Sequence, residues 1–180
     1  MWFHERDGES SAFFELGQEY ELQMETMTEL QMLGKIAIAA LLGGLVGIER
    51  EFAERPAGLR THMLVGATAT LFVMLADLLL SSFDPRDIIN ADPVRIIEAI
   101  VVGISFLGAG TILKYRQEGE RVVEGLTTSA SILSVAAIGI AVALNAYILA
   151  VGAALLNLFI NWGLMTLINR AKFKTKRSPD

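Results

Sequence analysis

Five long apolar segments restrict the fold of this chain more than any other feature of its sequence. Each contains 17 to 22 residues, and short polar stretches separate them. Their ranges are Met32–Ile48, His62–Leu80, Ile96–Leu113, Leu126–Leu144 and Tyr147–Ile168. An α-helix rises 1.5 Å per residue, so segments of this length can cross a hydrocarbon core of about 30 Å, the shortest with help from local thinning of the bilayer. We therefore expect five transmembrane helices.

The composition agrees with a membrane protein. Hydrophobic residues make up 53% of the chain, whereas soluble domains contain about 45–50% apolar residues. Helices of soluble proteins average about 11–12 residues and carry one polar face, which these segments lack. The sequence thus predicts an all-α fold, a polytopic transmembrane bundle of five spans, and a water-soluble helical core is the weaker alternative.

The basic residues predict the orientation, because lysine and arginine near span ends are retained in the cytoplasm. When the fifteen basic residues are assigned to the connections and ends of five spans, eleven fall on one side of the membrane and four on the other. The eleven are Arg50, Arg55, Arg60, Lys114, Arg116, Arg121, Arg170, Lys172, Lys174, Lys176 and Arg177, and the four are Arg6, Lys35, Arg86 and Arg95. We expect the amino terminus outside and the carboxyl terminus on the cytoplasmic side of the membrane.

The two ends of the chain differ in charge. Residues 1–31 form an acidic extension, and apolar residues spaced by three or four between Phe13 and Leu30 indicate a short amphipathic helix. No cleavable leader is expected, because the first ten residues lack an apolar core. Residues 169–180 form a basic tail, expected to lie along anionic headgroups, with a specific lipid or protein site as the alternative. The membrane domain between them spans residues 32–168.

A charged, turn-forming segment, RPAGLRTH, separates the first two apolar segments. Pro56 and Gly58 should end the first helix, and Thr61 is suited to cap the second. Arg60 would oppose the helix dipole there, so it serves topology, headgroup phosphates, or an acidic partner such as Glu49 or Glu51.

Four stretches resemble the successive signatures of the MgtC/SapB family of bacterial membrane proteins, in the family's order and spacing. They are GGLVGIERE (Gly43–Glu51), RPAGLRTHMLVGA (Arg55–Ala67), GISFLGAGTIL (Gly103–Leu113) and VEGLTTSASILSVAAIG (Val123–Gly139). The resemblance covers about residues 33–168 and implies a five-span inner-membrane protein of magnesium homeostasis. Glu98 and Ser105 stand where many relatives are expected to have Gln and Gly. We expect the short, SapB-like form without a soluble carboxyl-terminal domain.

Small residues recur within the apolar segments. Gly43, Gly44 and Gly47 let helices approach closely, and Gly103 and Gly108 thin the third helix in the same way. Close packing is the first interpretation of these glycines, and a cavity lining is the second. The stretch GISFLG has the spacing of a phosphate-binding loop but lacks the following Lys and Ser or Thr, so we expect no nucleotide there.

Ionisable residues inside a membrane are costly and therefore mark candidate sites. Asp77 and Glu98 lie about one turn inside the outer ends of the second and third helices, and the loop between them adds Asp84, Asp87 and Asp92. Mg²⁺ is commonly bound through one or two carboxylates and its own waters. Asp77 and Glu98 are thus a candidate outer cation or metal site, although pairing with Arg86 and Arg95 is the competing interpretation.

Two further groups of polar residues are candidates. A cytoplasmic polar cluster is expected from Glu49, Arg50, Glu51, Arg60, Thr61 and His62. Polar residues within the spans are Thr127, Ser131 and Ser134 on one face of the fourth helix, and Asn157 and Asn161 on one face of the fifth. Hydrogen bonds between helices are the first interpretation of the two amides, and a polar pathway is the second.

These residues support two functions, a Mg²⁺ transporter or a regulator that binds another membrane protein through glycine-rich helix faces. Mg²⁺ is then ligand or cargo, and no other cofactor is expected. Expected partners are the bilayer, another membrane protein or a second copy in a homo-oligomer, but not nucleic acid. An enzyme is not expected, because His4 and His62 are the only histidines and no nucleophile and base are paired. The chain has no cysteine, which excludes disulfides and thiolate metal sites.

The charge pattern generates a prediction about topology. A reporter that is active only outside the cytoplasm should be inactive when fused at residue 57 and active when fused at residue 88, because the first position lies among arginines and the second among aspartates. Activity at residue 57 would mean that the chain is inserted the other way round.

Overall fold

The computed structural model describes the backbone of residues 6–81, 93–117 and 120–163, and the side chains of residues 28–80, 94–116 and 121–163. The chain forms two units, Met1–Gly34 and Lys35–Asp180. All contacts between helices described below lie within the second unit. The predicted basic tail and the acidic loop with Asp84, Asp87 and Asp92 fall outside the described residues.

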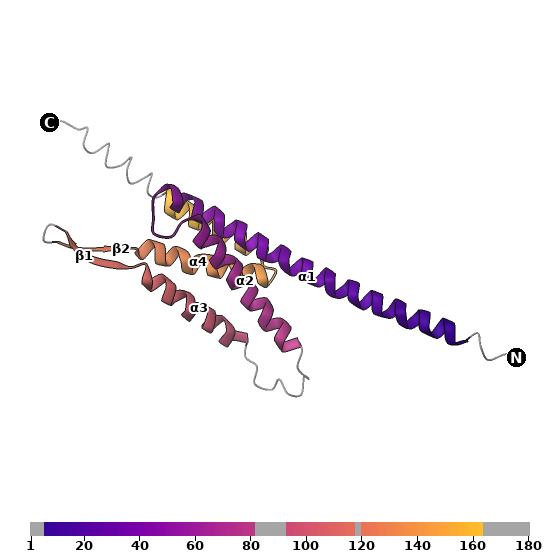
Figure 1. The fold of residues 1–180 in the computed structure, drawn as a ribbon. Coiled ribbons are helices and arrows are strands. Elements are labelled where there is room, and N and C mark those ends of the chain that lie inside the picture. Colours follow the sequence, from indigo (N-terminus) through magenta and orange to yellow (C-terminus); the bar gives the residue numbers. More distant parts are fainter. Residues whose placement is uncertain (1–5, 82–92, 118–119, 164–180) are drawn as a thin grey trace. The chain divides into compact units, whose positions relative to one another are not determined.

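The described residues are mostly helical, as the apolar segments predict (Figure 1). The α-helices are α1 (Arg6–Phe52), α2 (Leu59–Ser81), α3 (Pro93–Gly110), α4 (Leu126–Ala143) and α5 (Tyr147–Leu158), and α5 continues into a π-helical turn, η1 (Phe159–Gly163). Three stretches are long and apolar enough to cross a membrane, namely Thr28–Phe52, Leu59–Leu80 and Leu126–Ala143, and Tyr147–Gly163 is a shorter apolar helix. The protein is therefore a membrane protein, and the number of five spans stays a prediction.

The first helix is longer than the sequence analysis expects. The stretch predicted as a separate amphipathic helix and the first apolar segment form one continuous helix, α1, which begins at Arg6. A physical reason is visible in the sequence, because no proline precedes Pro56 and nothing therefore blocks the backbone hydrogen bonds of the helix.

An all-α fold is wrong at one place, the connection between the third and fourth helices. Strands β1 (Leu113–Gln117) and β2 (Glu120–Glu124) pair there in an antiparallel hairpin. The third helix ends at Gly110, because glycine is a poor helix former, and the predicted segment that runs to Leu113 is too long. Gly125, with φ of +88°, adopts the left-handed conformation that joins β2 to α4.

The helices of the second unit have two ends, which we name by their connections. At the hairpin end, α1 ends, α2 begins and the hairpin joins α3 to α4. At the far end, α2 ends, α3 begins and a tight turn joins α4 to α5. Asn145 occupies the left-handed conformation in that turn, with φ of +60°, and the Lys35 amino group donates to the Ala143 carbonyl oxygen at 3.4 Å, where a cation complements the helix dipole.

Helices α1, α2 and α4 approach each other backbone to backbone. A Cβ atom on Gly66 would lie 2.7 Å from the Ala39 carbonyl oxygen, and one on Gly139 would collide with the Gly66 carbonyl oxygen. The Thr70 hydroxyl lies 3.0 Å from the Gly66 carbonyl oxygen and 2.8 Å from that of Gly139. The close packing expected at Gly43 and Gly47 is present, because a Cβ atom there would meet the backbone of residues 58–62, whereas nothing lies within 4 Å of one on Gly103. Gly66 and Gly139 add close contacts that were not expected.

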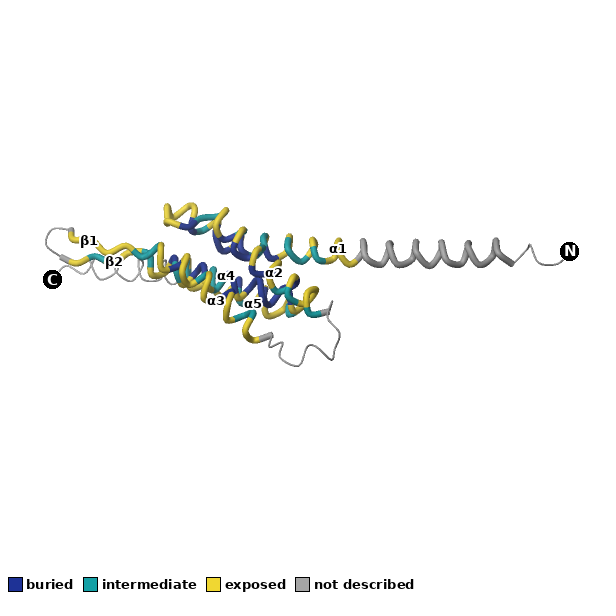
Figure 2. The backbone as a smooth tube through the Cα atoms, turned by 60° about the horizontal axis from the view of Figure 1, so that its bottom comes forward, coloured by how far each residue is buried: buried dark blue, intermediate teal, exposed yellow. Residues whose placement is uncertain are grey.

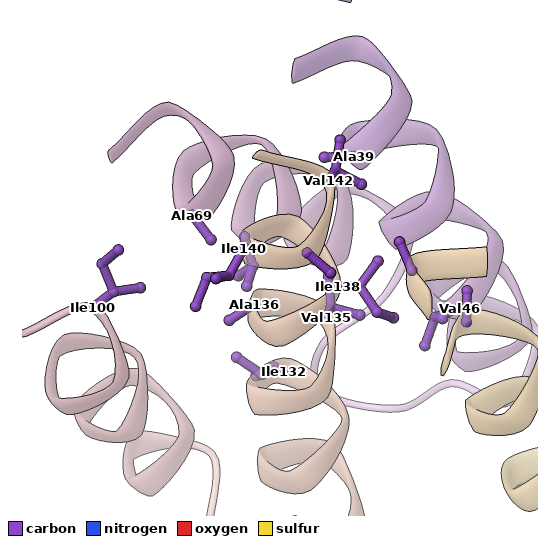
Figure 3. Packing of buried hydrophobic residues seen from close by; sticks show 14 of the residues in the cluster. Ala39, Val46, Ala69, Ile100, Ile132, Val135, Ala136, Ile138, Ile140 and Val142 are labelled. Atoms are coloured by element: carbon purple, nitrogen blue, oxygen red, sulfur yellow. The ribbon is translucent and has the colours of Figure 1, made fainter. Parts of the chain in front are cut away.

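Around these glycines lies the buried core. Val135 and Val142 of α4 are completely buried, as are Ala39 and Val46 of α1, and Figure 3 shows their side chains close together. Residues of α2, α3 and α5 complete the same cluster. Most large apolar side chains outside it are exposed, and Figure 2 shows exposed residues along α3 in particular. Such an exposed apolar surface fits a helical protein with lipid as its solvent.

The glycine contacts generate a prediction about stability. Gly66→Ala and Gly139→Ala should each destabilise the fold by about 1–3 kcal/mol, because the added methyl group meets backbone that cannot rotate away. Gly152→Ala is the matched control, since nothing lies within 4 Å of a Cβ atom there. The free energy of unfolding of the purified protein in detergent checks this, and equal stability of all three variants would contradict it.

Candidate functional site

Arg50 is the central residue of a polar site at the hairpin end. It belongs to the last turn of α1, yet only 3% of its surface is exposed. One terminal nitrogen, Nη2, donates to the Thr128 hydroxyl at 2.6 Å and lies 3.4 Å from the Thr127 hydroxyl, both on the first turn of α4. The guanidinium therefore ties the end of α1 to the beginning of α4.

His62, which is completely buried, makes a second link about one turn further along. Its Nδ1 lies 2.8 Å from the Gly58 carbonyl oxygen, which can only accept, so Nδ1 carries the hydrogen. In the neutral ring Nε2 is then an acceptor, and it lies 2.8 Å from the Ser131 hydroxyl of α4. The imidazole thus joins the start of α2 to α4.

We name Arg50, His62, Thr128 and Ser131 the hydroxyl cluster, because two basic side chains of α1 and α2 meet two hydroxyl groups of α4. Arg50 forms no ion pair with any described residue, and its Nε has no hydrogen-bond partner there. Glu49 Oε2 is likewise buried without a partner. The guanidinium donates to neutral hydroxyl oxygens, and the carboxylate of neighbouring Glu49 lies close enough to act on its charge.

Three other members of the predicted cytoplasmic cluster have different places. Glu51 Oε2 accepts a hydrogen bond from the Leu59 backbone N–H at 2.9 Å, so this carboxylate caps α2 at its first residue. Thr61 was predicted to be the cap, but it lies in the first turn and is exposed. Arg60 is also exposed and forms no described ion pair with Glu49 or Glu51. Only Arg50 and His62 of the predicted set enter the hydroxyl cluster.

The three polar residues predicted on one face of α4 differ in burial. Ser131 is buried and Ser134 is half-buried, whereas Thr127 is exposed and makes only the long contact with Arg50. Thr128 binds Arg50 more closely, and the sequence analysis missed it. The sequence indicates this role of Thr128 only weakly, because a threonine next to another threonine at a helix start is usually interpreted as part of a cap.

The two predicted metal ligands remain candidates. Asp77 lies near the end of α2 and Glu98 near the beginning of α3, both at the far end and both exposed. Within the described residues, no three side chains of His, Cys, Asp or Glu come together as a metal site. Arg95, also exposed, forms no ion pair with Glu98 in the single chain.

The two asparagines of α5 and η1 bind each other. Asn161 Nδ2 donates to Asn157 Oδ1 at 2.8 Å, and both side chains are half-buried. The hydrogen bond lies within one helical segment, whereas the sequence analysis favoured bonds between helices. The pair continues the face of Ala150 and Ala154, which are completely buried.

Comparisons with known proteins agree with the four sequence signatures. The model of the MgtC family matches residues 36–170. The "Putative magnesium transporter YhiD" of Escherichia coli K12 is 34% identical over 126 residues, which are 70% of this chain and 57% of that protein. Protein MgtC of Brucella abortus is 44% identical over 105 residues, 58% of this chain and 39% of that protein. Protein SapB of Bacillus subtilis is 34% identical over 116 residues, 64% of this chain and 49% of that protein.

The chain spans only 39% to 57% of the length of these relatives. No solved structure matches it. The matched region nevertheless contains the whole hydroxyl cluster and the glycine contacts of α1, α2 and α4. With its apolar helices and a match over most of its length, this chain belongs to the MgtC family.

Proposed function

We propose that this protein acts in magnesium homeostasis by moving Mg²⁺ across a bacterial inner membrane. Its membership of the MgtC family carries the proposal, together with the name of the Escherichia coli relative, "Putative magnesium transporter YhiD". The proposed topology has five spans, with the amino terminus outside and the carboxyl terminus in the cytoplasm. The hairpin end then faces the cytoplasm and the far end faces the outside.

Asp77 and Glu98 are the proposed outer cation site. Both carboxylates are exposed at the far end, where a hydrated cation can reach them without losing all its waters. Mg²⁺ dehydrates reluctantly and is commonly held by one or two carboxylates, which these two residues can supply.

A second function is supported by the packing of the bundle. The backbones of α1, α2 and α4 meet directly, and at the hairpin end Arg50 places a buried positive charge between α1 and α4. A pathway through the middle of these three helices would have to separate them. This favours a regulator that binds another membrane protein and does not move ions, or a transporter whose pathway runs along α3.

Flux measurements on reconstituted protein separate these functions. With an imposed Mg²⁺ gradient and a Mg²⁺-sensitive dye inside liposomes, the wild-type protein should give flux above that of empty liposomes. Asp77→Asn together with Glu98→Gln should reduce this flux at least about tenfold, because each neutral side chain loses a charged ligand for the cation.

Glu54→Gln is the matched control for that experiment. It removes one exposed carboxylate from the connection between α1 and α2, away from the far end, and should leave the flux unchanged. Flux that survives the double substitution would refute the outer site. Wild-type protein that gives no flux in repeated trials would refute transport and leave the regulator.

A further inference from the structure

No described residue of the second unit covers the outward face of α3. Ile96, Ile100 and Ile104 turn toward the core, with Ile100 only 7% exposed. On the opposite side Val102 is 68% exposed and Phe106 is 80% exposed. The face consists of Arg95, Glu98, Val102, Ser105 and Ala109, and all five are exposed.

The spacing and size of these residues suit a second helix. They recur at alternating steps of three and four along α3, which is the spacing of a seam between paired helices. Ser105 and Ala109 are small, and nothing lies within 4 Å of a Cβ atom on neighbouring Gly103 or Gly110. Small residues at such a face let two membrane helices approach closely.

The charges on the face identify the occupant. Arg95 and Glu98 are exposed within one turn of each other and form no ion pair with each other or with another described residue. In an isologous dimer the same surface of both copies forms the interface, and a residue i that contacts residue j of the other copy implies the reverse contact as well. A face with one cation and one anion one turn apart can therefore form two ion pairs with a second copy of itself. Arg95 directly precedes the predicted span Ile96–Leu113 and Glu98 lies one turn within it, so the pair would form at the outer edge of the contact. Charged groups near a span are usually paired.

We propose that two copies of this chain associate through the outward faces of α3, with Arg95 of each copy paired to Glu98 of the other. Val102 lies at the centre of the contact, and Ser105 and Ala109 allow the two backbones to approach.

This interface could form whether or not the protein transports Mg²⁺. A carboxylate has two oxygens, so Glu98 can accept from the guanidinium with one and face a hydrated cation with the other.

The absence of cysteine from the chain allows a direct test. Val102→Cys in the reconstituted full-length protein should give a disulfide-linked dimer on mild oxidation, because cysteines near a two-fold axis come within bonding distance. Leu155→Cys is the matched control, since Leu155 is 54% exposed and lies near the middle of the apolar stretch Tyr147–Gly163. Equal cross-linking of the two variants at every protein-to-lipid ratio would indicate random encounter and overturn the proposal.

Charge reversal tests the pairing itself. In the Val102→Cys background, Arg95→Glu and Glu98→Arg should each weaken dimerisation at least about tenfold, because one variant brings four acidic groups together and the other four basic groups. When the two variants are mixed, each acidic side chain meets a basic one, and cross-linked mixed dimers should form at the level of the parent.

This mixing experiment also controls for folding, because a misfolded variant could not be rescued by its counterpart. Distinct tags on the two copies identify the mixed dimer on a gel. Failure of the mixture to restore dimers, or reversal variants that dimerise as well as the parent, would overturn the pairing of Arg95 with Glu98. Neither result depends on Mg²⁺ flux, so this test can fail while the proposed function stands.

Discussion

The direct contact of helix backbones between α1, α2 and α4 is the constraint on which the rest of this structure depends. In a membrane, lipid tails are as apolar as leucine side chains, so helices gain little by hiding apolar surface from their solvent. Association then requires close packing, and Gly66 and Gly139 provide it by removing the side chains that would hold the backbones apart. The hydroxyl cluster follows from this closeness, because Arg50 and His62 reach Thr128 and Ser131 only when α4 lies near both other helices.

The two ends of the bundle differ in chemistry. At the hairpin end, a buried guanidinium and a buried imidazole are held by hydroxyl and carbonyl oxygens, which fixes α1, α2 and α4 together. At the far end, Asp77, Arg95 and Glu98 are exposed on α2 and α3. The two carboxylates of the proposed cation site thus lie at the end opposite to the one that is locked by buried hydrogen bonds.

Much of the fold could be predicted from the sequence, since apolar runs of membrane-spanning length have few alternatives. The hairpin of β1 and β2 could not, because five-residue strands rich in charge resemble any polar connection. The start of α1 at Arg6 was missed too, because the apolar spacing begins only at Phe13. The candidate site was foreseen only in part. The motifs indicated Arg50 and His62, but the choice of Thr128 over Thr127 depends on the rotation of α4 about its axis, which neighbouring helices set.

Thr70 supplies a hydrogen bond in the middle of the close contact between α2 and α4. Its hydroxyl lies within hydrogen-bond distance of two carbonyl oxygens, on Gly66 and on Gly139, but it carries a single hydrogen. The two carbonyls therefore share that hydrogen, and each must otherwise rely on the amides of its own helix. Hydrocarbon offers no donor, so the surrounding solvent could not replace this hydroxyl.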